Sequence, residues 1–364
     1  MKLMIYPAAR GGIRTVVENY RASGFTDADT QFIETYRDGG FVLRQAVFLK
    51  ALLACLRAFA SGSAELAHIH VAARGSFWRK TLIARLAALF RVPVIFHLHG
   101  SETKLFYSQQ PAWAQRIIAG AFSRADQVVV LSDSWAHFVT AIAPQARVTV
   151  IPNYVEVGPE TQQGPGPVEM LFLGLVGPRK GTFDLLRAFA GARQDVPDMR
   201  LTIGGNGDVE GAERLIAQLG LGDHVRLAGW VGPEERQQLL GRAAIYVLPS
   251  YNEGLPMSVL EAMSCGLATI TTRVGGLPEA ITDGVDGLMI EPGDVGALSA
   301  AIVALGRNDD FRRRIGQEAR ARIQAHYSAE VVLPRLTSLY AATIQDRGRP
   351  KTAGPVEPAA SKEG

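Results

Sequence analysis

The chain has 364 residues, of which 47% are hydrophobic and 20% charged. This balance is typical of a globular α/β protein and excludes a disordered or fibrous chain. The two cysteines, Cys55 and Cys265, lie far apart in apolar helical runs. We therefore expect a reducing compartment and exclude a disulfide scaffold or a cysteine metal site. The first residues form a strand-like run and not a signal peptide, so we predict a cytoplasmic protein.

Charge is distributed unevenly along the chain. The formal net charge is +3, but residues 1–155 contain 17 Lys and Arg against 9 Asp and Glu, whereas the remainder contains 21 against 26. A basic first half indicates an anionic partner, either a membrane surface, a phosphorylated acceptor or a nucleic acid. A nucleic acid is the least favoured of these, because the basic run lacks interleaved aromatic residues on a strand platform.

Short apolar runs alternate with helical stretches along the whole chain. The predicted strands are residues 3–6, 66–70, 92–97, 127–131, 148–151, 169–173, 200–203, 225–227, 245–248, 268–271 and 287–290. Such alternation predicts an α/β fold with parallel sheets, arranged as two Rossmann-like, doubly wound domains at residues 1–155 and 168–328. A single large sheet is disfavoured, because the break at 157–167 is long and loop-like. We expect a helix at 329–345 that packs back on the N-terminal domain, and a disordered tail at 346–364.

The run from Phe41 to Ala60 is long and apolar enough to suggest a transmembrane helix. Three internal cations, Arg44, Lys50 and Arg57, argue against a span. Lys50 and Arg57 fall about 20° apart on a helical wheel. The sequence leaves two interpretations open: a helix that covers a sheet, and a helix that lies on an anionic membrane leaflet.

The first domain contains two further motifs of interest. Gly11 and Gly12 open a helix after the first strand, where glycines let a backbone approach a ligand closely. His97 and His99 lie at the carboxyl end of a strand, where sites form in α/β proteins. The two histidines suggest a zinc pair, but no third ligand is evident, so we predict no metal site. A buried structural histidine is the alternative for either. Asp27-Ala28-Asp29 lacks the apolar strand that a metal–nucleotide DxD motif needs, and we reject that role.

The segment YNEGLPMSVLEAMSCGLATITTRVGGLP, from Tyr251 to Pro278, is the most informative part of the chain. An apolar strand precedes it, Pro256 suits the first helical position and Gly266 suits the position after the helix. A helix from about Pro256 to Ser264 would point its free N–H groups and positive dipole end at one spot, which forms an anion site. Glu253 and Glu261 flank this spot. A phosphate between two hydroxyl-binding carboxylates indicates a nucleotide sugar as the ligand.

Two cations follow another strand of the second domain. Arg179 and Lys180 lie at a strand–helix turn, where they would neutralise a leaving diphosphate, although ordinary surface positions remain an alternative for both. The loop around Gly205 and the turn at Gly229-Trp230 are candidates for ligand contact. The alternative for Gly205 is a tight turn without ligand contact, and the alternative for Trp230 is a place in the hydrophobic core.

These motifs, in this order, resemble the family 4 retaining glycosyltransferases, which have the GT-B fold of two Rossmann-like domains facing a cleft. The segment His68-Ile69-His70 and the basic turn from Arg74 to Lys80 look like the subgroup that builds bacterial surface polysaccharides. A solvated helix start is the alternative for the basic turn. One position departs from the family pattern, because Leu175 stands where many members carry arginine. Arg179 is a candidate to supply part of that missing charge.

The resemblance implies a role for each matching residue. His99 would contact the donor sugar, Glu253 would hold donor-sugar hydroxyls, Glu261 would hold the ribose, and Arg179 and Lys180 would meet the leaving phosphate. The remaining expected donor contacts are Gly11, Gly12, Gly205, Trp230, Gly254, Leu255, Pro256, Met257 and Ser258. The expected membrane or acceptor contacts are Lys50, Arg57, Arg74, Arg79 and Lys80.

The resemblance therefore implies a retaining, metal-independent hexosyltransferase without a cofactor. It would move a sugar from a UDP- or GDP-sugar to a lipid-linked or saccharide acceptor in bacterial polysaccharide biosynthesis, at the inner face of the plasma membrane. Two alternatives remain at this point: a non-catalytic protein that binds sugar nucleotide or membrane, and a sugar-nucleotide epimerase on the same fold. A phosphorylase of this fold is excluded by the chain length.

Overall fold

A computed structural model describes residues 1–9, 11–161 and 166–346. The chain divides into two compact units. Of the described residues, unit 1 contains Met1–Asn153 and 330–346, and unit 2 contains Tyr154–Ala329. The expected disordered tail lies outside the described residues from position 347 on.

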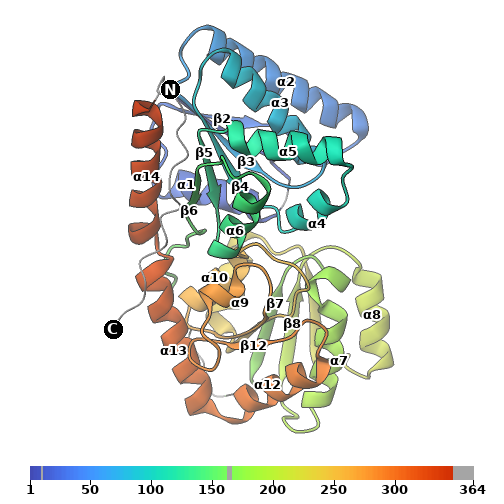
Figure 1. The fold of residues 1–364 in the computed structure, drawn as a ribbon. Coiled ribbons are helices and arrows are strands. Elements are labelled where there is room, and N and C mark those ends of the chain that lie inside the picture. The colour runs from blue at the N-terminus through green and yellow to red at the C-terminus, as the bar shows by residue number, and fades with distance from the viewer. Residues whose placement is uncertain (10, 162–165, 347–364) are drawn as a thin grey trace. The chain divides into compact units, whose positions relative to one another are not determined.

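Unit 1 is built on a parallel sheet whose described strands have the order β2-β1-β3-β4-β5-β6 (Figure 1). The strands are β1 (Lys2–Tyr6), β2 (Thr30–Glu34), β3 (Leu66–Val71), β4 (Val94–Leu98), β5 (Gln127–Val130) and β6 (Val148–Val150). The helices are α1 (Gly12–Ala22), α2 (Phe41–Ala60), α3 (Gly75–Leu89), α4 (Thr103–Ser108), α5 (Ala112–Arg124), α6 (Asp133–Ile142) and α14 (Ala329–Gln345).

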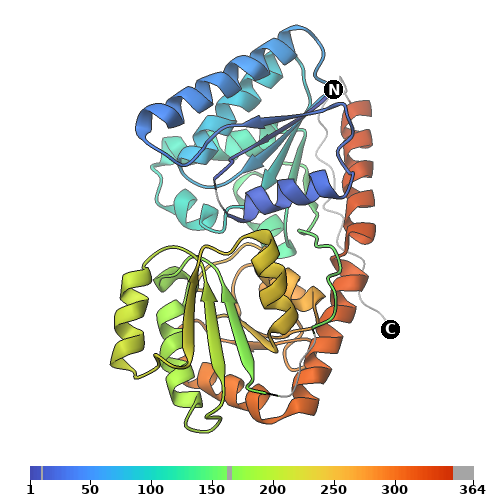
Figure 2. The ribbon, with the colours of Figure 1, turned by 180° about the vertical axis from the view of Figure 1, so that it is seen from behind.

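Alternating side chains of the unit 1 strands pack against different helices, because successive strand residues point to opposite faces of a sheet. Ile5, Ile69 and Phe96 belong to the hydrophobic core that includes buried residues of α2, α3, α5 and α6. His68, one residue before Ile69, contacts aromatic rings of α1 and α14 instead. Figure 2 shows the molecule from behind, with α1 in blue and α14 in red. One face of the sheet is therefore apolar, and the other carries histidines.

Unit 2 repeats the same design, with described strands in the order β12-β11-β10-β7-β8-β9, all parallel. The strands are β7 (Glu169–Leu173), β8 (Arg200–Gly204), β9 (Val225–Gly229), β10 (Ile245–Leu248), β11 (Ala268–Thr272) and β12 (Leu288–Ile290). The helices are η1 (Pro178–Lys180), α7 (Thr182–Ala192), α8 (Val209–Gln218), α9 (Pro233–Arg242), α10 (Met257–Ser264), α11 (Leu277–Ala280), α12 (Val295–Arg307) and α13 (Asp309–His326).

The predicted α/β fold with two Rossmann-like domains is confirmed, since each unit has a parallel sheet flanked by helices. The sequence did not predict strand β2. This strand lies at the edge of its sheet and buries only Ile33 among its five residues, so it shows no apolar run. Both cysteines are free and buried, as expected.

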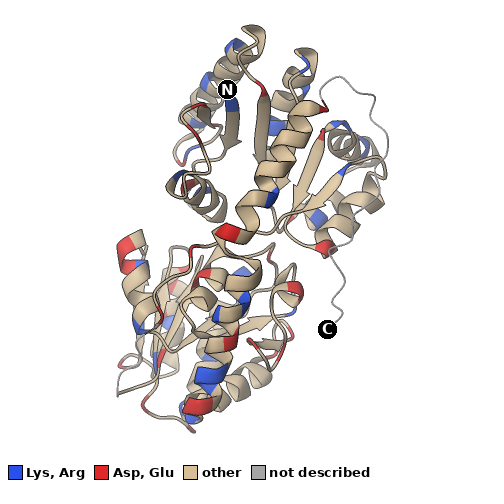
Figure 3. Ribbon diagram, turned by 90° about the vertical axis from the view of Figure 1, so that its left-hand side faces the viewer, with Lys and Arg blue, Asp and Glu red and all other residues tan. Residues whose placement is uncertain are grey.

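No helix among the described residues has the length and hydropathy needed to cross a membrane. Acidic and basic residues are interspersed along the helices of unit 2, and α13 carries both signs (Figure 3).

Candidate functional site

The carboxyl ends of β7 and β10 bring together a buried ion pair in unit 2. The two strands are parallel neighbours, so the residues that follow them meet at one edge of the sheet. Lys180, at the end of η1, places its Nζ 2.5 Å from Oε1 of Glu253, which lies in the loop after β10. The Ser250 hydroxyl donates to the same carboxylate oxygen at 2.7 Å. Glu253 is only 5% exposed, so this pair is held away from bulk water.

Two glycines allow the loop that carries Glu253 to pack closely. Gly275 has a φ of +59°, and a Cβ there would lie 2.0 Å from the Glu253 carbonyl oxygen. Gly181 has a φ of +70°, and a Cβ there would lie 2.0 Å from the Pro249 carbonyl oxygen. The adjacent Gly276 N–H donates to the Gly254 carbonyl at 2.7 Å. The position of Glu253 is therefore fixed from two sides by backbone that only glycine permits.

Arg179 lies beside the same loop. Its guanidinium donates to the Asn252 carbonyl at 3.4 Å, and its own carbonyl accepts from the Tyr251 N–H at 2.9 Å. Leu175, at the position where an arginine was expected, is 53% exposed at the end of β7. The structure thus brings both predicted cations to the loop that contains Glu253.

Glu261 forms a second carboxylate site on α10. Its carboxylate lies 3.3 Å from Nη1 of Arg236, on α9. Burial raises the pKa of Glu261, and the nearby Arg236 charge opposes that rise. The sequence analysis did not identify Arg236, because nothing in the spacing of a polar surface helix indicates which arginine faces the neighbouring helix.

The start of α10 differs by one residue from the prediction. Pro256 is the residue before the first helical position, and the helix begins at Met257. Gly266 has a φ of +77° just after the helix, as expected. Leu255 and Met257 are buried, whereas Pro256 and Ser258 are partly exposed. The first-turn N–H groups therefore begin at Met257, four residues after Glu253.

Gly205 and Trp230 lie at the ends of two further strands of unit 2. A Cβ on Gly205 would lie 1.7 Å from the Gly174 carbonyl oxygen, so this glycine lets two loops pack together. Trp230 is 49% exposed at the end of β9, which rules out the alternative of a core tryptophan.

In unit 1, the loop with Gly11 and Gly12 is exposed, and a Cβ on either glycine would meet no atom within 4 Å. A polar cavity of about 370 Å³ lies at the nearby ends of β1 and β2. The sequence analysis did not identify the charged residues around it, which are Arg14, Glu18, Arg21, Glu34, Arg37 and Asp38.

Four histidines lie together on the second face of the unit 1 sheet. The register of β3 and β4 pairs His70 with His97. Nε2 of His68 lies 3.1 Å from Nδ1 of His97, and Nδ1 of His70 lies 2.8 Å from Nε2 of His99. Burial lowers the pKa of His68 to about 3, and burial together with the Lys80 charge lowers that of His99 to about 3. Burial also lowers the pKa of His70 and of His97 well below its ordinary value, so all four rings are neutral at physiological pH.

The predicted membrane or acceptor contacts of unit 1 separate into exposed and buried groups. Lys50 and Arg57 are exposed on α2. Arg74 is exposed and lies 3.6 Å from Glu102, while Arg79 is partly buried with its guanidinium over the Tyr36 ring.

Lys80 requires a correction, because it is fully buried and cannot contact a membrane surface. It is positioned one helical turn after Ser76 and donates to the Ser76 hydroxyl at 2.8 Å. Burial, together with the neighbouring Arg79 charge, lowers the pKa of Lys80 to about 7.

Helix α2 exposes apolar as well as basic side chains. Ala51, Cys55 and Phe59 face the core, so the side of the helix that carries Lys50 and Arg57 faces solvent. Large apolar side chains are exposed there and on the adjacent helix α3. They are Phe41, Val42, Leu43, Leu49, Leu53, Leu56, Leu82 and Leu89, and we call this set the α2–α3 apolar surface.

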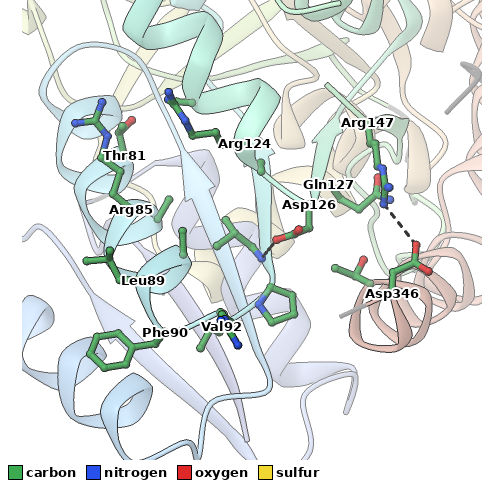
Figure 4. A pocket seen from close by; sticks show the side chains of 18 residues that line it. Thr81, Arg85, Leu89, Phe90, Val92, Arg124, Asp126, Gln127, Arg147 and Asp346 are labelled. Carbon is green, nitrogen blue, oxygen red and sulfur yellow. Dashed lines mark hydrogen bonds and ion pairs between the residues drawn. The ribbon is translucent and has the colours of Figure 1, made fainter. Parts of the chain in front are cut away.

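A cavity of about 940 Å³ lies at the amino ends of the unit 1 strands, opposite the end where the histidine strands terminate (Figure 4). Its lining includes Pro93, Val94 and Gln127, at the amino ends of β4 and β5. Asp126 accepts from the Val94 N–H at 2.8 Å, and Arg147 lies 3.4 Å from Asp346. Ligands of α/β sheets usually bind at the carboxyl ends of the strands, where His99 and the glycine loop lie. This cavity lies at the amino ends and is therefore separate from them.

Comparison with known protein families gives two adjacent matches. Residues 14–158 match the family described as Glycosyltransferase Family 4, and residues 159–322 match the family described as Glycosyl transferases group 1. Together the two matches span nearly all of the described chain.

Known proteins agree with these matches. Glycogen synthase of Mycobacterium tuberculosis is 27% identical over 292 residues, which cover 74% of this chain and 68% of that protein. A GDP-mannose-dependent α-(1-6)-phosphatidylinositol monomannoside mannosyltransferase of Mycolicibacterium smegmatis is 29% identical over 242 residues, which cover 60% of this chain and 62% of the relative.

Two solved structures share the fold. Sucrose-phosphate synthase from Thermosynechococcus elongatus has a TM-score of 0.76 at 19% identity, with 95% of this chain and 99% of that chain covered. Anabaena HepE in complex with UDP-glucose has a TM-score of 0.76 at 17% identity, with 94% and 100% covered.

Proposed function

This chain belongs to glycosyltransferase family 4 and has the GT-B fold, and on that premise we propose a specific reaction for it. The protein transfers a hexose from a nucleoside-diphosphate sugar to a lipid-linked saccharide acceptor, with retention of anomeric configuration. The acceptor belongs to bacterial polysaccharide biosynthesis, and the reaction takes place at the inner face of the plasma membrane.

The observation that carries this proposal is the buried Lys180–Glu253 pair at the carboxyl edge of the unit 2 sheet. In a glycosyl transfer, the bond from the anomeric carbon to the phosphate oxygen breaks, and the acceptor hydroxyl oxygen bonds to that carbon and releases its proton to the departing phosphate or to water. The diphosphate departs with a growing negative charge. A fixed ammonium in a site of low dielectric stabilises that charge. A carboxylate next to it can accept hydrogen bonds from the sugar hydroxyls. When the donor binds, the contact between Lys180 and Glu253 breaks. Lys180 then contacts the phosphate, and Glu253 accepts hydrogen bonds from the sugar hydroxyls.

The neighbouring groups suit the other parts of a nucleotide sugar. Arg179, on the same turn as Lys180, adds a second positive charge for the diphosphate in place of the arginine missing at Leu175. The first-turn N–H groups of α10 offer phosphate contacts, since the positive dipole end of a helix favours anions. Glu261, more than one turn further along, is proposed to hold the ribose hydroxyls.

We propose that donor chemistry requires no divalent metal. Among the described residues of unit 2, the donor site combines two cations and a helix N-terminus, which supply the positive charge that Mg²⁺ supplies in other transferases. Among the residues that the structure describes, Glu253 is the one carboxylate in an ion pair with either cation. Mg²⁺ is usually held by carboxylates together with phosphates, and Glu253 is already engaged by Lys180 and Ser250.

Two observations support a lipid-linked acceptor. The α2–α3 apolar surface lies next to the exposed cations Lys50 and Arg57, a combination that favours an anionic leaflet. The mycobacterial relative is named as a phosphatidylinositol monomannoside mannosyltransferase, which acts on a lipid. The polar cavity of unit 1 is the proposed acceptor site, and Gly11, Gly12 and His99 remain proposed donor contacts.

A product assay tests the proposal directly. Purified protein is incubated with each of a panel of UDP-, GDP- and ADP-sugars and with lipid-linked saccharides extracted from bacterial membranes. One donor should increase the acceptor mass by a single sugar residue. NMR of the product should show the anomeric configuration of the donor. Release of free sugar without transfer, or a product of inverted configuration, would contradict the proposal.

A further inference from the structure

We propose that His68, His70 and His97 form a site for a borderline-soft divalent metal ion, with zinc as the best fit, inside unit 1. One ring nitrogen from each of the three residues lies within 4.8 Å of the other two. All three side chains are almost completely buried, at 1% exposure or less. Its ligands come only from β3 and β4, and none of the three is among the residues proposed to contact the donor.

The fold explains why three rings from two strands meet at one point. His68 and His70 are two residues apart on β3 and therefore share a face of the sheet. The β3–β4 register places His97 directly opposite His70. A tetrahedral zinc site with bonds of about 2.1 Å holds its nitrogens about 3.4 Å apart. The present separations are at most 4.8 Å, so small ring rotations would give this geometry.

Two nitrogen atoms at the site have no partner in the described part of the chain. Nε2 of His70 and Nε2 of His97 are buried and form no hydrogen bond. A neutral imidazole needs a donor or an acceptor at each ring nitrogen, and a buried nitrogen without one is costly. A bound metal ion would satisfy both of these atoms at once.

The remaining ring nitrogens have the partners that metal-binding histidines usually have. Nδ1 of His68 lies 2.5 Å from the Tyr340 hydroxyl, and Nδ1 of His70 lies 2.8 Å from Nε2 of His99. Such hydrogen bonds fix the tautomer of a metal-binding histidine. Nε2 of His70 is then free to bind a metal, whereas Nε2 of His68 must exchange its 3.1 Å hydrogen bond with Nδ1 of His97 for the metal. His70 would then donate to His99, so metal binding would also fix the orientation of the His99 ring.

The ligand chemistry selects the class of metal. Three neutral imidazoles favour zinc, cobalt, nickel or copper over magnesium, calcium or manganese, which prefer oxygen ligands. Three histidines with an open fourth position also form a known type of zinc site. The Lys80 ammonium, which acts electrostatically on His70 and His99, opposes a cation. Because its pKa is about 7, this opposition weakens at pH 8.

The test uses full-length protein without a histidine tag, stripped with a chelator and dialysed at pH 8 against Co²⁺ or Zn²⁺. The expected stoichiometry is one ion per chain by elemental analysis. Bound Co²⁺ should give the visible absorption of a tetrahedral site, and Zn²⁺ should displace it. The wild-type spectrum alone therefore tests the site, even if a variant folds poorly.

Variants locate the ion. His70→Gln and His97→Gln should lose the bound Co²⁺ and its absorption, while His137→Gln, an exposed position of the same unit, should retain both. A wild-type protein that binds less than a tenth of an equivalent would overturn the proposal. Full binding in both His70→Gln and His97→Gln would also overturn it, because the ion would then lie elsewhere.

Discussion

Lys180 and Glu253 neutralise each other in a buried site. In the proposed reaction, Lys180 contacts the diphosphate and Glu253 contacts the sugar. Lys180→Met removes the charge that meets the departing diphosphate. We expect turnover to fall by about 100- to 1,000-fold, the usual cost of losing one group that stabilises transition-state charge. Steady-state kinetics with the identified donor provides the measurement. Arg214→Met, on the exposed side of α8 in the same unit, is the matched control and should retain wild-type turnover.

Lys80 provides a prediction about the pH dependence of stability. Its pKa is about 7 in the folded protein and 10.5 in its ordinary environment. Below pH 7 the lysine is charged in both states, and the folded state carries the full cost of a buried charge. Between pH 7 and 10.5 the unfolded state binds more protons, so stability increases with pH and the cost is relieved.

Lys80→Met should therefore stabilise the protein at pH 6.5, by a few kcal/mol in order of magnitude. This advantage should shrink steadily as the pH rises toward 10. Guanidinium unfolding of both proteins at pH 6.5, 8 and 9.5 gives the comparison. Lys104→Met, at an exposed position of unit 1, should show no such pH dependence. An advantage of equal size at every pH would mean that Lys80 is not charged in the folded protein at pH 6.5.

At the scale of single elements, the conformation of the loop after β10 depends on Gly275, which lies in the loop after β11. Gly275→Ala would place a methyl group 2.0 Å from the Glu253 carbonyl oxygen at a φ of +59°. Gly284→Ala has a similar φ of +76° but open space around it. We expect the Gly284 variant to lose about 1 kcal/mol of stability through backbone strain alone.

The Gly275 variant should lose more stability than the Gly284 variant and should also bind the donor at least tenfold more weakly, because the Glu253 backbone must move. Calorimetric titration with the donor and thermal unfolding measure the two effects. Equal donor affinity in the two variants would mean that this contact does not position Glu253.

Much of each element could be predicted from local sequence. The apolar runs predicted every strand except the half-exposed edge strand β2, and Gly266 marked the end of α10 correctly. Pro256 was misplaced by one position, because a proline is compatible with both the first helical residue and the residue before it.

Contacts between distant residues could not be predicted in the same way. Lys180 and Glu253 were each singled out, but their pairing across 73 residues depends on β7 and β10 being neighbours in the sheet. His97 was considered as a metal ligand and rejected for lack of a third residue, and only the β3–β4 register reveals His68 and His70 beside it. Lys80 was misread as a surface cation, since the basic turn gives no sign of which side faces the core.

At the scale of the whole molecule, the α2–α3 apolar surface predicts binding to membranes. Each basic residue near an anionic leaflet contributes about 1 kcal/mol, so reversing two charges should weaken binding by 10-fold or more. We expect Lys50→Glu/Arg57→Glu to bind vesicles with 30% phosphatidylglycerol at least ~10-fold more weakly than wild type. Arg187→Glu/Arg214→Glu, an equal charge change on unit 2, is the control. Equal loss in both double variants would indicate a general charge effect and contradict a docking surface on α2.

The central claim is that unit 2 binds a nucleotide sugar through Glu253. The most direct measurement is calorimetric titration of the wild type, Glu253→Gln and the exposed-site control Glu213→Gln with UDP-, GDP- and ADP-sugars, with and without Mg²⁺. Magnesium does not suit the histidine site of unit 1, so this arm tests the donor site alone. We predict that the wild type and Glu213→Gln bind one nucleotide sugar equally well regardless of Mg²⁺, and that Glu253→Gln binds it about 10- to 100-fold more weakly. Equal affinity in Glu253→Gln, or no binding of any nucleotide sugar by the wild type, would contradict the account.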